Sequence, residues 1–142
     1  MDRVVIDSSV VIKWFVVENN TAEALQVRAR YDADDLVLLA PDLINVEVGN
    51  IIWKKQKLGL LLAPEAEIIF NDFLTIELEL TTATDLLEDA YRIAVTHGPS
   101  VYDPLYIALS LREQCSFVTA DEKLLNAVGG TYPNIVSLSN WS

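Results

Sequence analysis

Two carboxylates follow short apolar runs, at positions where acidic side chains can do chemistry. Asp7 comes directly after a β-branched run and precedes Ser8 and Ser9, and Asp121 follows another apolar run. Asp and Ser at such positions commonly cap the helix that follows. Ligands of open parallel sheets also bind there, beyond the carboxyl ends of the strands. Helix capping and chemistry therefore both stay open for Asp7 and Asp121.

Two further carboxylates interrupt the apolar faces of expected helices. Leu43 and Ile51 lie four residues before and after Glu47, and Ile107 lies four residues after Asp103. Residues four apart share a helix face, so both carboxylates are expected to point toward the core. The helix dipole favours an acid in a first turn, which accounts for Asp103 but not for Glu47 inside its helix. Because no Lys or Arg lies three or four residues from Glu47, its burial predicts another source of positive charge.

A divalent metal ion would supply that charge. Mg²⁺ takes oxygen ligands, and it usually keeps several waters while using one or two protein carboxylates. Such an ion can activate water and stabilise a leaving oxygen in phosphate chemistry. His97 and Cys115 are each the only residue of their type, which excludes histidine-rich and thiolate metal sites. If the four carboxylates converge at one edge of a sheet, they predict an acidic Mg²⁺ site.

The elements expected to position these residues alternate between strands and helices. Short apolar runs predict strands at 3–6, 36–40, 76–80, 116–119 and 135–138. Segments of helical period predict helices at 8–17, 21–31, 43–57, 64–74, 84–97, 102–113 and 122–128. Strands that are apolar on both faces are typical of a parallel sheet covered by helices. The sequence therefore predicts one α/β domain over residues 1–142, an α/β/α sandwich with a mostly parallel five-stranded sheet.

Composition narrows the function classes. The 142 residues include 10 Lys and Arg against 21 Asp and Glu, a formal net charge of −11, and 51% of them are hydrophobic. That apolar share excludes intrinsic disorder, and no apolar run approaches the roughly 18 residues needed to cross a bilayer. We expect a cytoplasmic protein with no membrane association, since the first residues lack the features of a signal peptide. Its acidity disfavours nucleic acid unless clustered positive charge or bound metal offsets it.

The acidic segments, taken in order, resemble those of a known family. Asp-Ser-Ser-Val-Val-Ile at 7–12, the helix around Glu47, Tyr-Asp-Pro-Leu-Tyr-Ile-Ala-Leu at 102–109 and Val-Thr-Ala-Asp-Glu-Lys-Leu at 118–124 are similar to successive segments of PIN-domain ribonucleases. The similarity is greatest to VapC-type toxins of prokaryotic toxin–antitoxin pairs. The resemblance implies a PIN-like fold and an endoribonuclease that hydrolyses RNA with Mg²⁺ or Mn²⁺. It also implies a homodimer held inactive by a cognate VapB-like antitoxin.

The resemblance assigns catalysis and metal binding to four carboxylates, Asp7, Glu47, Asp103 and Asp121. It assigns to Ser8 and Ser9 the hydroxyls that support Asp7. Pro104 departs from the family, in which a small helix-forming residue is more usual, but proline is tolerated in a first helical turn.

Basic residues near these segments are candidate RNA contacts. Lys13, Arg112 and Lys123 each follow an acidic segment closely enough to approach the expected crevice. Solvation of an ordinary helix surface is the alternative, as it is for the lysines at 54, 55 and 57.

Two other function classes remain open. A Mg²⁺-dependent phosphoacceptor or phosphatase also places Asp after a strand, but position 9 is Ser rather than a second Asp, and neither scheme uses Glu47 or Asp103. In a non-catalytic PIN-like scaffold, the acidic pocket would serve partner binding alone.

Overall fold

One parallel sheet organises the computed structural model, which describes residues 1–141. Its strands are β1 (Asp2–Ile6), β2 (Leu36–Pro41), β3 (Glu79–Thr81), β4 (Ser116–Thr119) and β5 (Ile135–Ser137). They lie in the order β3-β2-β1-β4-β5, and every neighbouring pair is parallel. β1 and β4 are therefore neighbours at the centre of the sheet, although more than a hundred residues separate them in sequence.

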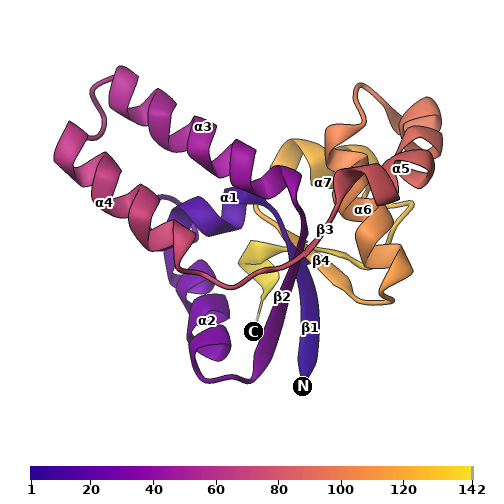
Figure 1. The fold of residues 1–142 in the computed structure, drawn as a ribbon. Helices are drawn as coiled ribbons and strands as arrows, with labels where there is room; N and C mark the ends of the chain where they lie inside the picture. The colour runs from indigo at the N-terminus through magenta and orange to yellow at the C-terminus, as the bar shows by residue number, and fades with distance from the viewer. Residues whose placement is uncertain (142) are drawn as a thin grey trace.

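Helices cover both faces of this sheet. They are α1 (Ser8–Val11), α2 (Thr21–Asp32), α3 (Leu43–Lys57), α4 (Ala63–Leu74), α5 (Ala83–His97), α6 (Tyr102–Arg112) and α7 (Glu122–Val128). Single 3₁₀ turns follow at Ile12–Trp14 and Leu138–Asn140. Figure 1 shows α1 to α4 on one side of the strands, with α3 and α4 projecting as a hairpin, and α5 to α7 on the other side. Within residues 1–141, no helix is both long and apolar enough to span a membrane.

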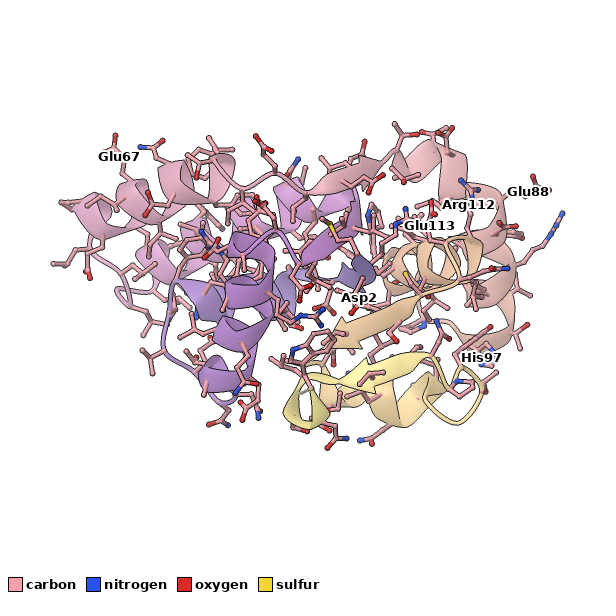
Figure 2. All side chains as sticks on the ribbon, turned by 90° about the horizontal axis from the view of Figure 1, so that it is seen from below. Asp2, Glu67, Glu88, His97, Arg112 and Glu113 are labelled. Carbon is pink, nitrogen blue, oxygen red and sulfur yellow. The ribbon has the colours of Figure 1, made fainter. Side chains whose placement is uncertain are left out.

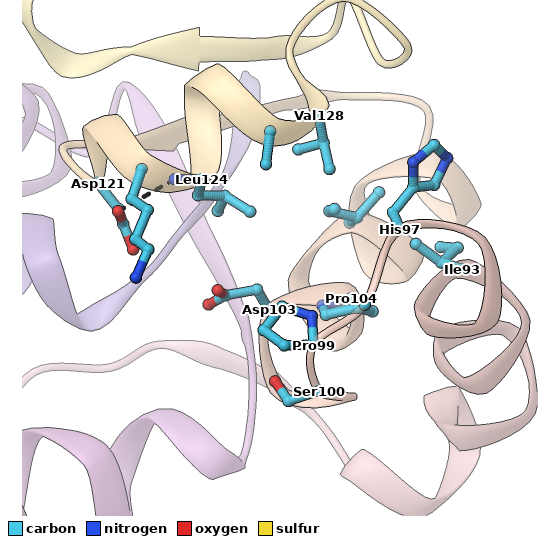
Figure 3. Close-up of a pocket in the computed structure, with 13 residues that line it drawn as sticks. Ile93, His97, Pro99, Ser100, Asp103, Pro104, Asp121, Leu124 and Val128 are labelled. Carbon is cyan, nitrogen blue, oxygen red and sulfur yellow. Dashed lines mark hydrogen bonds between the residues drawn. The ribbon is translucent and has the colours of Figure 1, made fainter.

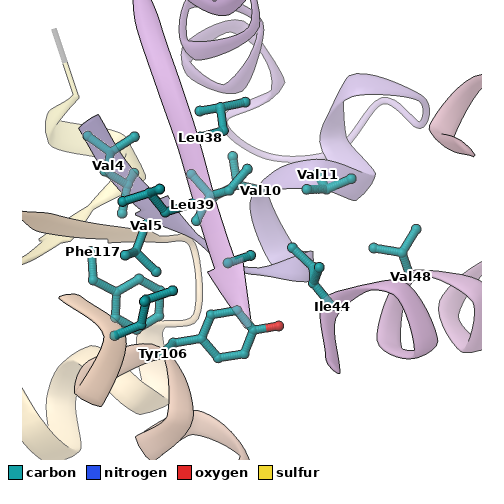
Figure 4. Packing of buried hydrophobic residues seen from close by; sticks show 14 of the residues in the cluster. Val4, Val5, Val10, Val11, Leu38, Leu39, Ile44, Val48, Tyr106 and Phe117 are labelled. Atoms are coloured by element: carbon teal, nitrogen blue, oxygen red, sulfur yellow. The ribbon is translucent and has the colours of Figure 1, made fainter. Parts of the chain in front are cut away.

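Burial at the centre of the core holds α6 in place. This helix is buried continuously from Pro104 to Ser110, between the sheet and α5. Its Tyr106 ring stacks on Phe117 of β4, with the ring centroids 5.6 Å apart and the planes 16° from parallel. Figure 4 shows both rings packed beside Val5 and Leu39 of the central strands. Because α6 is fixed along its length, Asp103 in its first turn is held at the edge of the sheet.

The predicted α/β sandwich and its five strands are confirmed, and every strand pairing is parallel. Two segments differ from the expected bounds by more than one residue. The strand predicted at 76–80 begins at Glu79, because β3 pairs with β2 only from Leu39 to Pro41. The helix predicted at 8–17 ends at Val11 and tightens into a 3₁₀ turn, after which the Trp14 indole N–H donates to the Ala24 carbonyl at 2.8 Å.

Candidate active site

The sheet changes winding direction between β1 and β4. From β1 the chain proceeds to β2 on one side, and from β4 it proceeds to β5 on the other. Such a switch point leaves a crevice beyond the carboxyl ends of the two strands. Asp7 directly follows β1, Thr119 ends β4, and Asp121 lies two residues further on.

Asp7 is held by donors from α1 and from the central strand β4. Its Oδ1 accepts from the Ser9 backbone N–H at 3.1 Å and from the Ser9 hydroxyl, and its Oδ2 accepts from the Thr119 hydroxyl. The Ser9 hydroxyl oxygen also accepts from the Ala120 N–H at 3.0 Å, which ties the start of α1 to the end of β4. Asp7 thus caps α1 and also lies in the crevice, so the two interpretations of its position are compatible.

The negative charge at Asp7 is incompletely offset. Its side chain is buried, with 7% of the residue exposed. Burial raises the pKa of Asp7 to about 6, the hydrogen bonds from Ser9 and Thr119 oppose that rise, and the charges of Asp103 and Glu47 add to it. A carboxylate with three good donors and a raised pKa lacks a nearby cation.

Glu47 and Asp103 reach the same crevice from α3 and α6. The Tyr106 hydroxyl donates to Glu47 Oε1, and this bond joins the two helices. Burial raises the pKa of Glu47, which the Tyr106 hydrogen bond lowers and the charge of Asp103 raises further. Burial, with the charge of Glu47, also raises the pKa of Tyr106. Tyr106 therefore stays protonated and remains a donor to Glu47.

Asp121 is the fourth carboxylate of the site, and with Asp7, Glu47 and Asp103 it forms a row of carboxylates. Its Oδ1 accepts from the Leu124 N–H at 3.1 Å and so caps α7, as the capping interpretation predicts. Burial raises the pKa of Asp103, and the charge of Asp121 raises it further. Since the charge of Asp103 also raises the pKa values of Asp7 and Glu47, Asp103 lies near all three other carboxylates. Figure 3 shows the Asp103 and Asp121 side chains at the same end of a pocket.

The donor chemistry of this row fits a hard divalent cation. All four side chains offer oxygen, the ligand that Mg²⁺ and Mn²⁺ prefer. No three Asp, Glu, His or Cys side chains within residues 1–141 converge closely enough to bind a metal as a ready-made cluster. Mg²⁺ does not require one, because it takes one or two carboxylates and completes its shell with water and substrate oxygens. Burial is the main cause of the raised pKa values of Asp7, Glu47 and Asp103, and the charges of neighbouring carboxylates add to it; a bound cation would offset both effects.

Two residues of the site were not predicted from the sequence. Thr119 ends an apolar strand, and only the strand order shows that its hydroxyl meets Asp7. Tyr106 lies in a helix that is apolar all round, where a buried hydroxyl normally needs a partner; this is a signal that the sequence does contain. Of the two predicted serines, Ser9 contacts Asp7, whereas Ser8 makes no side-chain hydrogen bond within residues 1–141.

The three basic residues predicted near the crevice lie in different places. Lys123 lines the pocket beside Asp103 and Asp121. Lys13 forms an ion pair with Glu18 at 3.2 Å. Arg112 is at the opposite end of α6 from Asp103, where its neighbour Glu113 pairs with Arg3 at the start of β1. Figure 2 shows Arg112 beside Glu113, on a different part of the surface from His97.

Fold and site together define an α/β protein with a row of carboxylates at the switch point of a parallel sheet, a class of site suited to metal-assisted phosphate chemistry. A profile of the PIN domain matches residues 4–130, and the chain belongs to the PIN-domain family.

Relatives of known name agree with this assignment. The chain is 32% identical over 124 residues to Ribonuclease VapC3 of Pyrobaculum aerophilum, a match that covers 86% of this chain and 92% of the relative. Its fold is similar to the crystal structure of PAE2754 from the same organism, with a TM-score of 0.70, 20% identity, and 97% and 85% of the two chains covered. It is also similar to a toxin–antitoxin complex from Klebsiella pneumoniae, with a TM-score of 0.58, 10% identity, and 95% and 97% covered.

Proposed function

We propose that this protein is a metal-dependent endoribonuclease and the toxin of a toxin–antitoxin pair. The observation that carries the proposal is the buried Asp7 at the switch point, held by Ser9 and Thr119 and close enough to Asp103 and Glu47 for their charges to raise its pKa. The relative named Ribonuclease VapC3 supports RNA as the substrate class.

The four carboxylates would bind a metal ion, and the neighbouring residues hold the carboxylates in place. Among Asp7, Glu47, Asp103 and Asp121, one or two would bind Mg²⁺ or Mn²⁺ directly, and the others would act through its bound waters. When bound, such an ion polarises a phosphoryl oxygen and lowers the pKa of water. Ser9 and Thr119 orient the Asp7 carboxylate and favour its ionised form, because both donate to it.

The other two helices fix the remaining carboxylates. Tyr106 fixes Glu47 by a hydrogen bond, and the buried α6 fixes Asp103. Asp121 is anchored through the first turn of α7. The carboxylates are thus set by buried or capped elements rather than by mobile loops, as precise positioning of a phosphodiester and water requires.

The arrangement disfavours a phosphoacceptor. An acceptor Asp must be reached by the phosphoryl donor, but Asp7 is only 7% exposed, and the hydroxyl hydrogen bonds to both of its oxygens reduce their nucleophilicity. Labelling with acetyl phosphate or beryllofluoride should therefore leave Asp7 unmodified.

Cleavage of a mixed-sequence fluorogenic RNA by the antitoxin-free protein tests the proposal. We expect cleavage with Mg²⁺ or Mn²⁺, none in EDTA, and loss of activity in Asp7→Asn and Asp103→Asn proteins that remain folded. Asp72→Asn, the same change at an exposed position of α4, is the matched control and should keep full activity. If structured tRNA and rRNA also stay intact with every metal, the catalytic proposal is wrong and a binding scaffold remains.

An antitoxin and a second copy of the chain are the proposed protein partners. The structural neighbour from Klebsiella pneumoniae, a toxin–antitoxin complex, supports the first. Aromatic side chains are enriched at protein interfaces; Trp53 on α3 is 56% exposed, whereas Trp14 and Phe15 pack partly against the core. Light scattering of the protein with and without its antitoxin would measure both associations.

A further inference from the structure

A pocket of about 260 Å³ lies between α5, α6 and α7, next to the carboxylates. Its walls are mostly apolar. Leu124 and Val128 of α7 stand on one side, Pro99 and Pro104 on the other, and Ile93 and His97 close one end (Figure 3). Pockets that take drug-sized ligands measure about 300–1,000 Å³, so this one suits a single small ring system.

The walls of the pocket are built from fixed parts of the fold. Pro104, Leu124 and Val128 are buried core residues, and the ring of His97 packs edge-on against Tyr132 with centroids 5.5 Å apart. The pocket is therefore a preformed slot with two apolar sides. A flat ring gains most from such a slot, because both of its faces leave water.

One end of the slot lies at two carboxylates of the acidic site. Asp103 and Asp121 line the pocket as well as belonging to the row of carboxylates, and Lys123 stands on the same rim. A single ligand can therefore place one group in the slot and another at Asp103 and Asp121. In RNA, the group one sugar away from a phosphate is a nucleobase.

We propose that this slot binds the nucleobase adjacent to the phosphodiester bond that is cleaved. The inference rests on the proposed ribonuclease function and adds a subsite to it. The base packs between the proline side and the α7 side, while the phosphate lies at the carboxylates and Lys123 faces the backbone. The slot then positions the bond and contributes to the choice of cleavage sequence, since stacking and shape differ between bases.

Binding of neutral nucleosides tests the slot without requiring catalysis. The probes are adenosine, guanosine, cytidine and uridine, which avoid repulsion between a phosphate and the carboxylates in EDTA. We expect at least one of them to shift the backbone amide NMR signals of Ile107, Leu124 and Val128, and ribose to leave them unchanged. If no nucleoside shifts them at millimolar concentration, or if N-acetyl-leucinamide shifts them and the nucleosides do not, the slot is not a base site.

A variant that fills the slot tests its part in cleavage. Ala127 lines the pocket but is exposed at its rim, so Ala127→Phe places a ring there without disturbing the core. Ala22→Phe, at an exposed position of α2 on the other face of the sheet, is the control. With wild-type protein, removing the base beside the cleaved bond should lower kcat/KM about ten- to hundredfold, the range expected for one stacked base.

The filled variant should cleave the normal and the abasic RNA at similar, low rates, and the control should behave as wild type. The proposal would be overturned if removal of the base lowered kcat/KM by the same factor in Ala127→Phe as in wild type. Failure of the ribonuclease function itself would appear differently, as absence of cleavage by wild-type protein with every RNA, and the nucleoside NMR experiment would still report on the slot.

Discussion

The stability of the metal-free protein should fall as the pH rises from about 4 to about 6, because of Asp7. Burial raises the pKa of this group from 3.8 to about 6, so the folded protein binds its proton more tightly than the unfolded chain does. The stabilisation by that proton is complete below pH 3.8 and is lost as the pH rises through 6. At about 1.4 kcal/mol per pKa unit, a rise of about two units costs roughly 3 kcal/mol by neutral pH. The pKa values of Glu47 and Asp103 are also raised, and they add to the slope with the same sign.

Asp7→Asn should remove the part of this slope that comes from Asp7. The amide that replaces the Asp7 carboxylate cannot ionise. Its NH₂ group cannot accept the hydrogen bond from the Thr119 hydroxyl, and the Thr119 oxygen already accepts from the Asp121 N–H at 3.1 Å. A mismatched hydrogen bond costs about 1–3 kcal/mol. The variant should therefore be less stable than wild type near pH 4.5 and equal or more stable near pH 7.5.

Urea unfolding at several pH values in EDTA, at constant ionic strength, measures this difference. Asp72→Asn is the control and should follow the wild-type slope. Added Mg²⁺ should restore stability at pH 7.5 in wild type, by about 2.7 kcal/mol at one hundred times its Kd, and should have little effect on Asp7→Asn. A wild-type stability that stays level between pH 4.5 and 7.5, or an unchanged slope in Asp7→Asn, would refute the reasoning.

Three further predictions concern single contacts of the site. Thr119→Val removes a donor from buried Asp7, so urea unfolding at pH 7 should show a free energy of unfolding lower by about 1–3 kcal/mol. Cleavage should fall while the circular dichroism spectrum stays that of the wild type. Tyr106→Phe keeps the ring stacked on the core but frees Glu47; a Mg²⁺ titration of cleavage should show apparent metal affinity weakened about 10- to 100-fold, as for other groups that orient metal ligands, and unchanged affinity would exclude this role. Lys123→Ala should weaken RNA binding and reduce the salt dependence by about one phosphate contact, whereas Arg112→Ala at the far end of α6 should bind RNA as wild type does.

Local patterns in the sequence predict most of the fold, because each strand and helix has its own signal. The helix over residues 43–57 and the strand over 116–119 are confirmed at both ends, since clear turn or loop residues bound each apolar segment. Residues 76–80 show where such patterns fail. Ile76 and Leu78 pack against the core as a strand would, but the ladder with β2 begins only at Glu79. Burial can be read from one segment, whereas strand pairing depends on its partner.

The residues of the candidate site show the same difference between local signals, which the sequence contains, and contacts that depend on strand pairing. Glu47 and Asp103 stand out in sequence because an acid on an apolar helix face needs compensation, and the structure brings both to the crevice. Thr119 does not stand out, since a threonine is an ordinary residue at the end of a strand. Its contact with Asp7 depends on β1 and β4 being neighbours, and no pattern local to either strand contains that information. The separation of Arg112 from the site has the same origin, because an eleven-residue helix carries its two ends about 15 Å apart.

The acidity of the chain links metal binding to RNA binding. The net charge is −11, and several of the basic side chains are engaged in ion pairs, including Lys13 and Lys55 with Glu18 and Arg30 with Asp2 and Asp35. Two carboxylates, Asp103 and Asp121, and one ammonium, that of Lys123, line the pocket, so we expect the metal-free site to repel phosphate. A divalent ion there would reverse the local sign, and by thermodynamic reciprocity RNA must raise the affinity for the ion by the factor with which the ion raises the affinity for RNA. A metal affinity measured without RNA therefore understates the affinity at work during cleavage, and weak binding of Mg²⁺ to the free protein is compatible with an efficient metal-dependent enzyme.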